Sequence, residues 1–140
     1  MPIGDGKATE KKVRDTMVVE EASNPLFSFE RLYDARAARG KFPPQTSDYH
    51  VDFNGRSIYV ECKETTDPDT ISISAFDQFP RMKRKEMAGA PGALVVYHIR
   101  ERVYRLVPLA DFPLSTRTFK LSTYQTHRDL KGLIKFLEGL

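Results

Sequence analysis

The chain has little of several features that would identify a class of protein, and each shortage excludes something. It has one cysteine among 140 residues, which excludes an internal disulfide. It has no apolar run long enough to cross a bilayer and no signal-peptide pattern at its start. Its net charge is only +3, which by itself does not indicate a nucleic-acid partner. We therefore expect a soluble cytoplasmic protein with one domain over residues 1–140 and a flexible stretch at 1–6.

What the sequence does have is a strong hairpin signal in its middle. Asn54 and Gly55 separate two runs in which apolar and polar residues alternate, and Asn-Gly is the preferred pair for a two-residue type I′ turn. Phe53 then faces Arg56. Continuing the antiparallel pairing along the ladder places Asp48 directly opposite Glu61.

The two faces of this hairpin have different characters. One face is apolar and should join the core: Tyr49, Val51, Phe53, Ile58, Val60 and Cys62. The other is polar: Asp48, His50, Asp52, Ser57, Tyr59, Glu61 and Lys63. Two carboxylates opposed across a ladder repel each other unless a cation lies between them, and oxygen ligands suit Mg²⁺ or Mn²⁺. The pattern therefore predicts a metal site with a lysine beside it, and Cys62 as a small buried side chain rather than a reactive thiol.

An aspartate followed, after a gap, by Glu-x-Lys at a hairpin resembles the PD-(D/E)xK nuclease superfamily, with Ser47 in place of the motif's proline. Asp111 with Asp129-Leu130-Lys131 also satisfies a loose form of the motif. No hairpin connects that second pair, whereas the Asn-Gly turn supplies the geometry for Asp48 and Glu61.

The remaining elements follow from periodicity and turn residues. We expect a helix over 7–21, a strand over 26–33, a basic loop over 35–47, and strands over 93–99 and 103–108. A helix capped by Ser74 or Asp77 should run to about residue 88 and bury Phe76, Phe79 and Met82. A C-terminal helix should carry Leu130, Leu133, Ile134 and Leu137, with Thr126 and Asp129 as its capping box.

This order resembles the restriction-endonuclease-like αβββαβ core, an α/β fold with a mixed sheet, here followed by a C-terminal helix. The resemblance covers residues 6–112. It is greatest to the RecU-type and phage Holliday-junction resolvases, which are small, basic and dimeric, although the long basic stalk of RecU is short or absent here.

The resemblance implies roles for five catalytic residues and a metal ligand set. Asp48, Glu61 and the Cys62 carbonyl would hold Mg²⁺ or Mn²⁺, and Lys63 would orient water or neutralise charge on the phosphate. Glu10, in Gly6-Lys7-Ala8-Thr9-Glu10, would lean into the metal site, and its alternative is a glutamate favoured by the helix dipole. Gln78 would place a phosphate or the attacking water, and its alternative is a capping or surface glutamine. His50 is interpreted as structural or DNA-facing.

The implied partner is DNA, branched in the case of a resolvase, bound by a homodimer in a bacterial or phage-infected cell. The basic residues expected to contact it are Arg36, Arg39, Lys41, Arg81, Lys83, Arg84 and Lys85. The implied reaction is metal-dependent hydrolysis that leaves a 5′-phosphate and a 3′-hydroxyl, as in DNA recombination. The alternatives are a nicking or restriction-type endonuclease of the same fold, or a DNA-binding module without turnover. The complete set of Asp48, Glu61 and Lys63 argues against the module.

Overall fold

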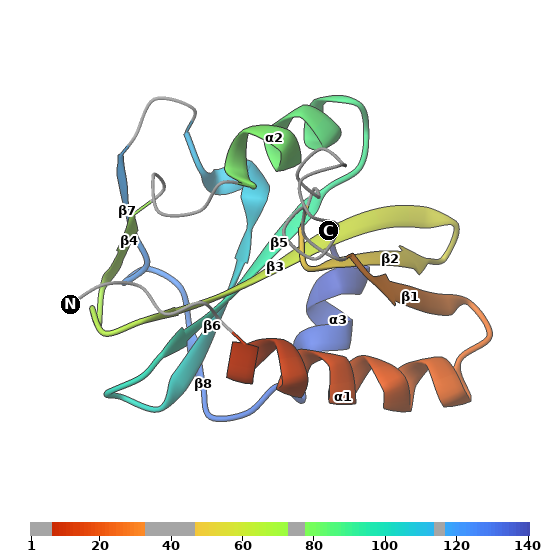
Figure 1. Ribbon diagram of the computed structural model, residues 1–140, viewed down its shortest axis with the longest axis horizontal. Coiled ribbons are helices and arrows are strands. Elements are labelled where there is room, and N and C mark those ends of the chain that lie inside the picture. The colour runs from red at the N-terminus through yellow and green to blue at the C-terminus, as the bar shows by residue number, and fades with distance from the viewer. Residues whose placement is uncertain (1–6, 33–46, 73–77, 114–116) are drawn as a thin grey trace, which may run out of the picture.

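The computed structural model describes residues 7–32, 47–72, 78–113 and 117–140 (Figure 1). Across these ranges the helices are α1 (Lys7–Ser23), α2 (Phe79–Met87), the short 3₁₀ helix η2 (Leu109–Asp111) and α3 (Leu133–Glu138). The strands are β1 (Phe27–Arg31), β2 (Tyr49–Phe53), β3 (Arg56–Thr65), β4 (Thr70–Ser72), β5 (Gly92–His98), β6 (Val103–Pro108), β7 (Thr118–Lys120) and β8 (Thr126–His127).

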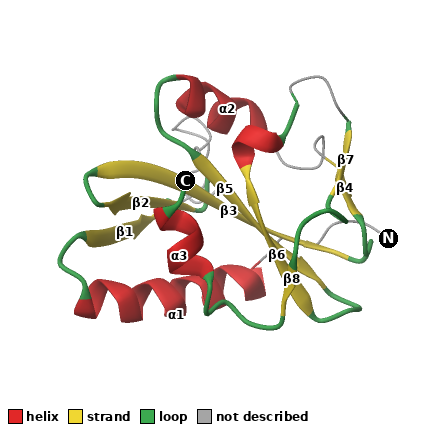
Figure 2. Ribbon diagram, turned by 180° about the vertical axis from the view of Figure 1, so that it is seen from behind, coloured by secondary structure: helices red, strands yellow, loops and turns green. Residues whose placement is uncertain are grey.

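A mixed sheet forms the centre of the molecule, with strand order β1-β2-β3-β5-β6-β8. Helices α1 and α3 cover one face of this sheet and α2 covers the other, as the views from the two sides show (Figures 1 and 2). Strands β4 and β7 pair separately, beyond α2. Each face of the main sheet therefore has its own hydrophobic cluster, one including Val13 and Met17 of α1 and the other including Phe79 and Met82 of α2.

The central hairpin has the predicted turn and the predicted register. Asn54 and Gly55 both have positive φ, 52° and 80°, as a type I′ turn requires. Tyr49 pairs with Val60 and Phe53 with Arg56. The apolar face is buried along its whole length, and Cys62 is buried with it, as predicted.

Strand β3 is longer than its hairpin partner, and this difference positions the site. The β2–β3 ladder ends at Tyr49 and Val60, whereas β3 continues to Thr65 in parallel pairing with β5. Glu61 and Lys63 therefore lie on a stretch of β3 whose β2-facing edge has no strand partner within the described residues. The chain between β3 and β5 passes through α2, and the two strands are parallel, so strand, helix and strand form a crossover.

Several predicted boundaries were wrong. Helix α2 begins at Phe79 with Gln78 as its N-cap, later than predicted. The predicted caps Ser74 and Asp77, with Phe76, lie outside the described residues. Thr126 belongs to β8 and pairs with Arg105, so the capping box is wrong as well. Helix α3 instead begins after Gly132. The strands β4, β7 and β8 were not predicted, because two or three residues are too few to display a period of two.

Candidate active site

The ladder between β2 and β3 ends next to Asp48, whose side chain takes the place of a backbone acceptor. Its Oδ2 accepts a hydrogen bond from the backbone N–H of Cys62 at 2.8 Å, in the place where a further ladder residue would follow. The preceding Ser47 is 3 % exposed, and its hydroxyl donates to the Tyr49 carbonyl at 2.8 Å. These two bonds stop β2 and hold the Asp48 carboxylate against β3, next to Glu61.

Glu61 is the most deeply buried acid of the described residues. It is 1 % exposed, and its Oε2 lies 3.4 Å from Nζ of Lys63, whose side chain is 12 % exposed. Its second oxygen, Oε1, is buried and has no hydrogen-bond partner among the described residues. A buried carboxylate oxygen without a partner is costly, so this atom is suited to a ligand that supplies positive charge.

The electrostatics of Asp48 and Glu61 indicate a pair that cannot hold two full charges unaided. Burial, followed by the nearby Glu61 carboxylate, raises the pKa of Asp48 from 3.8 to about 7. Burial also raises the pKa of Glu61, although the Lys63 ammonium acts in the opposite direction. Near neutral pH the two carboxyls therefore compete for one proton. A divalent cation bound between them would replace that proton and neutralise both charges.

Glu10, from the first turn of α1, is brought to the same pair. Its side chain shares a hydrogen bond with the Asp48 carboxyl, and that contact lowers the pKa of Asp48. Its backbone carbonyl accepts a hydrogen bond from the Tyr49 hydroxyl at 3.0 Å. Glu10, which was predicted to lie at the metal site, thus contacts Asp48.

These residues fit a partly formed metal site rather than a closed one. Among the described residues, no group of three or more His, Cys, Asp or Glu side chains is arranged to hold a metal ion by itself. Mg²⁺ is usually bound by one or two protein carboxylates, with water and substrate phosphate completing the shell. Two neighbouring carboxyls suit that arrangement, since one of them has a buried oxygen for which the described part of the chain offers no hydrogen-bond partner.

Gln78 occupies the N-cap position of α2, but its side chain makes no capping hydrogen bond there. Its Oε1 is buried and has no partner among the described residues. No hydrogen bond within the described ranges connects Gln78 to Asp48 or Glu61. The structure therefore leaves a buried acceptor at the start of α2 without joining it to the acidic pair.

The basic residues of α2 do not share one surface. Arg81 and Arg84 are exposed, and Lys85 is half-buried with its Nζ 5.7 Å from the centre of the Tyr59 ring. Lys83 is 7 % exposed, and its amine donates to the Leu109 carbonyl at 2.9 Å. The prediction that Lys83 is displayed with the others was wrong, because η2 packs beside α2 and supplies an acceptor for it. Arg36, Arg39 and Lys41 lie outside the described residues.

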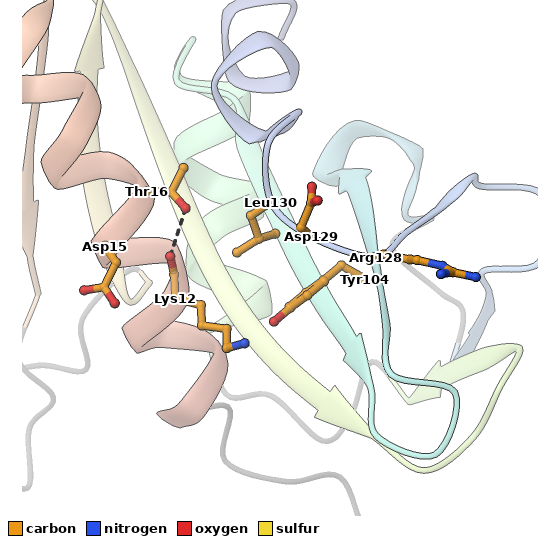
Figure 3. Close-up of a pocket in the computed structure, with 7 residues that line it drawn as sticks. All are labelled: Lys12, Asp15, Thr16, Tyr104, Arg128, Asp129 and Leu130. Carbon is orange, nitrogen blue, oxygen red and sulfur yellow. Dashed lines mark hydrogen bonds between the residues drawn. The ribbon is translucent and has the colours of Figure 1, made fainter.

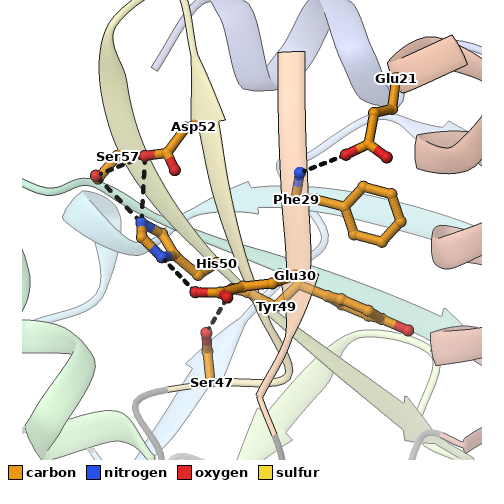
Figure 4. Close-up of polar contacts among 8 residues, drawn as sticks. All are labelled: Glu21, Phe29, Glu30, Ser47, Tyr49, His50, Asp52 and Ser57. Atoms are coloured by element: carbon orange, nitrogen blue, oxygen red, sulfur yellow. Dashed lines mark hydrogen bonds and ion pairs between the residues drawn. The ribbon is translucent and has the colours of Figure 1, made fainter.

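A polar network around His50 extends the site's face of the hairpin (Figure 4). Nδ1 of His50 lies 3.2 Å from Oε1 of Glu30, and Nε2 lies 3.1 Å from the Ser57 hydroxyl and 3.4 Å from Oδ1 of Asp52. The ring stacks on Tyr59 at 4.9 Å between centroids. Alternation in the sequence placed most of these side chains on one face, but Glu30 arrives only through the pairing of β1 with β2, which no local pattern reveals.

A buried polar cluster that sequence reasoning missed fixes the turn after β3. His98 is fully buried, with Nδ1 2.9 Å from the Asp67 carbonyl and Nε2 3.1 Å from Nη1 of Arg105. That guanidinium nitrogen also donates to the Pro68 carbonyl at 2.7 Å. Burial lowers the pKa of His98, which keeps the ring neutral as an acceptor for Arg105.

The structure also has a groove that contains none of the predicted site residues (Figure 3). Its volume is about 270 Å³, and it lies between α1, β6 and the segment that leads into α3. The lining residues are Lys12, Asp15, Thr16, Tyr104, Arg128, Asp129 and Leu130. It is therefore separate from the acidic pair.

Comparisons with known proteins identify the fold. No protein-family model matches the chain, and no curated protein matches it. Among solved structures, the chain is similar to Hjc, a Holliday junction resolvase from the archaeal hyperthermophile Archaeoglobus fulgidus, with a TM-score of 0.51 and 16 % sequence identity. The match covers 81 % of this chain and 89 % of Hjc. At this identity the likeness shows a shared fold alone, and it agrees with the predicted α/β fold with a mixed sheet. Within the described ranges, no helix is both long enough and apolar enough to cross a membrane.

Proposed function

We propose that this protein is a metal-dependent endodeoxyribonuclease that resolves Holliday junctions. One observation carries the proposal: the half-buried Asp48 carboxyl and the buried Glu61 carboxyl lie beside Lys63, where β3 extends past the end of β2. The shared fold with Hjc supports it, because the likeness spans most of both chains.

Asp48 and Glu61, with the Cys62 carbonyl, would hold Mg²⁺ or Mn²⁺. When bound, such an ion would supply a Lewis acid and an activated water. Lys63 is nearly buried and held by Glu61, so its ammonium would stay in place to neutralise charge that develops on the phosphate. Glu10, through its contact with Asp48, would orient that carboxylate toward the ion.

Binding of the DNA backbone would come from α2. Arg81 and Arg84 are exposed on this helix and would contact phosphates without reading sequence. Gln78, whose Oε1 is buried and unpartnered among the described residues, would face a substrate phosphate or water at the start of the same helix.

A resolvase must make two coordinated cuts, which requires two sites, so we infer a two-fold symmetric homodimer in solution. Its place of action would be the cytoplasm of a bacterial or phage-infected cell. A relationship to the RecU type in particular stays a prediction.

The test is to incubate the protein with four-way junction, linear duplex or single strand of the same sequence, with Mg²⁺, Mn²⁺ or EDTA. We expect cleavage of the junction in either metal, and none in EDTA. Asp48→Asn and Glu61→Gln should bind the junction without cutting it. Lys131→Ala is a matched control, since that lysine side chain is 91 % exposed, and it should cut normally.

Two outcomes would change the proposal. Equal cleavage of duplex and junction by a protein that sediments as a monomer would remove the resolvase function and leave a nicking or restriction-type nuclease. Junction binding without cleavage in either metal would favour the non-catalytic binding module.

A further inference from the structure

The first turn of α1 is tied to the far end of β3 by one side chain. Oε1 of Glu64 accepts hydrogen bonds from the Thr9 backbone N–H at 3.2 Å and from the Thr9 hydroxyl at 3.1 Å. Thr9 is 1 % exposed and Glu64 is half-buried, so both bonds are partly shielded from water. A helix start usually obtains such a cap from a residue next to it in the chain. Here the cap comes from a strand 55 residues away, so it fixes the helix relative to the sheet.

The next residue, Glu10, is held from the other side. Its carbonyl accepts the Tyr49 hydroxyl, and Tyr49 immediately follows Asp48 at the start of β2. Glu10 therefore lies between two anchors, one at Tyr49, directly after Asp48, and one on β3, which carries Glu61. Its side chain meets Asp48 from this fixed position.

We propose that Glu64 is a positioning residue that acts through Thr9, setting the first turn of α1 so that the Glu10 carboxyl faces Asp48 and contributes to the binding of the divalent cation. The inference rests on the proposed function, because it concerns the same metal site. Its physical basis is that the first turn of a helix frays unless its free N–H groups are satisfied. Without Glu64, Thr9 would lose both bonds and Glu10 would leave the pair for much of the time.

The experiment measures metal binding by thermal unfolding, as the Mn²⁺ concentration at which half of the metal-induced rise in Tm is reached. Glu64→Ala should raise this midpoint about tenfold, in the range found when a residue that orients a metal ligand is removed. Glu64→Gln should restore the wild-type midpoint, because its amide oxygen can accept both bonds from Thr9. Thr9→Val and Thr9→Ser form a milder pair: the valine variant should weaken binding and the serine variant should not.

Combining Glu64→Ala with Glu10→Ala distinguishes a role through Glu10 from a general effect on the structure. If Glu64 acts through Glu10, the double variant should bind Mn²⁺ no more weakly than Glu10→Ala alone. The inference would be overturned if the two substitutions weakened Mn²⁺ binding additively. It would also be overturned if Glu64→Ala had the same Mn²⁺ midpoint as the wild type. A Glu64→Gln variant as weak as the alanine variant would also overturn it, since charge rather than position would then be responsible. If Glu64→Ala fails to fold, the comparison of Thr9→Val with Thr9→Ser tests the inference: equal Mn²⁺ midpoints for the two would overturn it.

The same thermal unfolding measurement distinguishes failure of the proposed metal site from failure of the inference about Glu64. A wild type whose Tm ignores both Mn²⁺ and Mg²⁺ would overturn the metal site and this inference together. A wild type that responds while Glu64→Ala responds equally would overturn this inference and leave the metal site standing.

Discussion

Replacing Asp48 by asparagine should stabilise the metal-free protein, and the gain should depend on pH. Asparagine keeps the size of the side chain and an oxygen that can accept the Cys62 N–H, but it carries no charge. The wild-type carboxyl has its pKa raised from 3.8 to about 7 in the folded state, mainly by burial and by Glu61. The folded protein therefore loses stability as pH rises from about 4 to 7, because the unfolded chain releases its proton first.

The size of the effect follows from the same pKa values. A pKa of about 7 in the folded state, against 3.8, corresponds to at most about 4 kcal/mol of unfolding free energy at pH 8. Relaxation of the site and water entry lower this figure, so we expect a gain of about 2 to 4 kcal/mol. For a chain of 140 residues, a change of 1 kcal/mol moves Tm by about 3 °C.

The assay is thermal or urea unfolding in EDTA from pH 4 to 8. Wild type and Asp48→Asn should coincide near pH 4 and separate steadily until about pH 7. Asp15→Asn is the control, since its carboxylate forms an exposed pair with Lys11 and should shift stability by less than about 1 kcal/mol at every pH. A pH-independent difference, or an Asp48→Asn protein less stable than wild type at pH 8, would refute the reasoning about the buried pair.

Metal should narrow the difference in stability between wild type and Asp48→Asn. At a metal concentration ten times the Kd, preferential binding to the folded state adds about 1.4 kcal/mol to wild-type stability. Asp48→Asn lacks one carboxylate and should gain much less, so the gap between the two should narrow when Mg²⁺ or Mn²⁺ is added.

Three further predictions address other parts of the molecule. Lys63→Ala should keep the metal-induced rise in Tm but lose turnover; loss of both would make this lysine part of metal binding. Arg81→Ala with Arg84→Ala should flatten the salt dependence of DNA binding, whereas Lys83→Ala should leave the salt slope unchanged and lower stability by about 1 to 3 kcal/mol, because the Leu109 carbonyl loses its donor. The lowered pKa of His98 means that its folded form resists protonation, so stability should fall as pH drops below about 6.5, and a urea series should show that His98→Gln lacks this fall.

The parts of the fold that could be predicted from sequence were those fixed by local rules. The Asn54-Gly55 turn determines the register, and continuing that register by one residue past Tyr49 and Val60 predicts Asp48 beside Glu61. The burial of Cys62 follows from strand alternation in the same way. Each of these depends on residues at most 14 positions apart in the chain.

The parts that could not be predicted depend on distant partners. Lys83 turns inward because a carbonyl 26 residues later in the chain lies beside α2. The ring of His98 meets the carbonyl of Asp67 only after β5 has paired with β3. Glu64 looks like an ordinary charged residue near the end of a strand until α1 is placed against it. Periodicity carries no information on such contacts, because each requires the tertiary arrangement first.

The unequal lengths of β2 and β3 have an energetic consequence that bears on function. Stopping β2 with the Asp48 side chain buries the Glu61 carboxyl and half-buries that of Asp48, where apolar residues could have continued the core, as Cys62 does on the other face. In the metal-free protein this arrangement costs up to about 4 kcal/mol near neutral pH, a large part of the 5 to 15 kcal/mol that stabilises a typical domain. A protein that only held DNA would gain nothing from it, since carboxylates repel phosphate. Binding of a divalent cation would offset this cost, and cleavage by the wild type but not by Asp48→Asn would support a role for that cation in the chemistry.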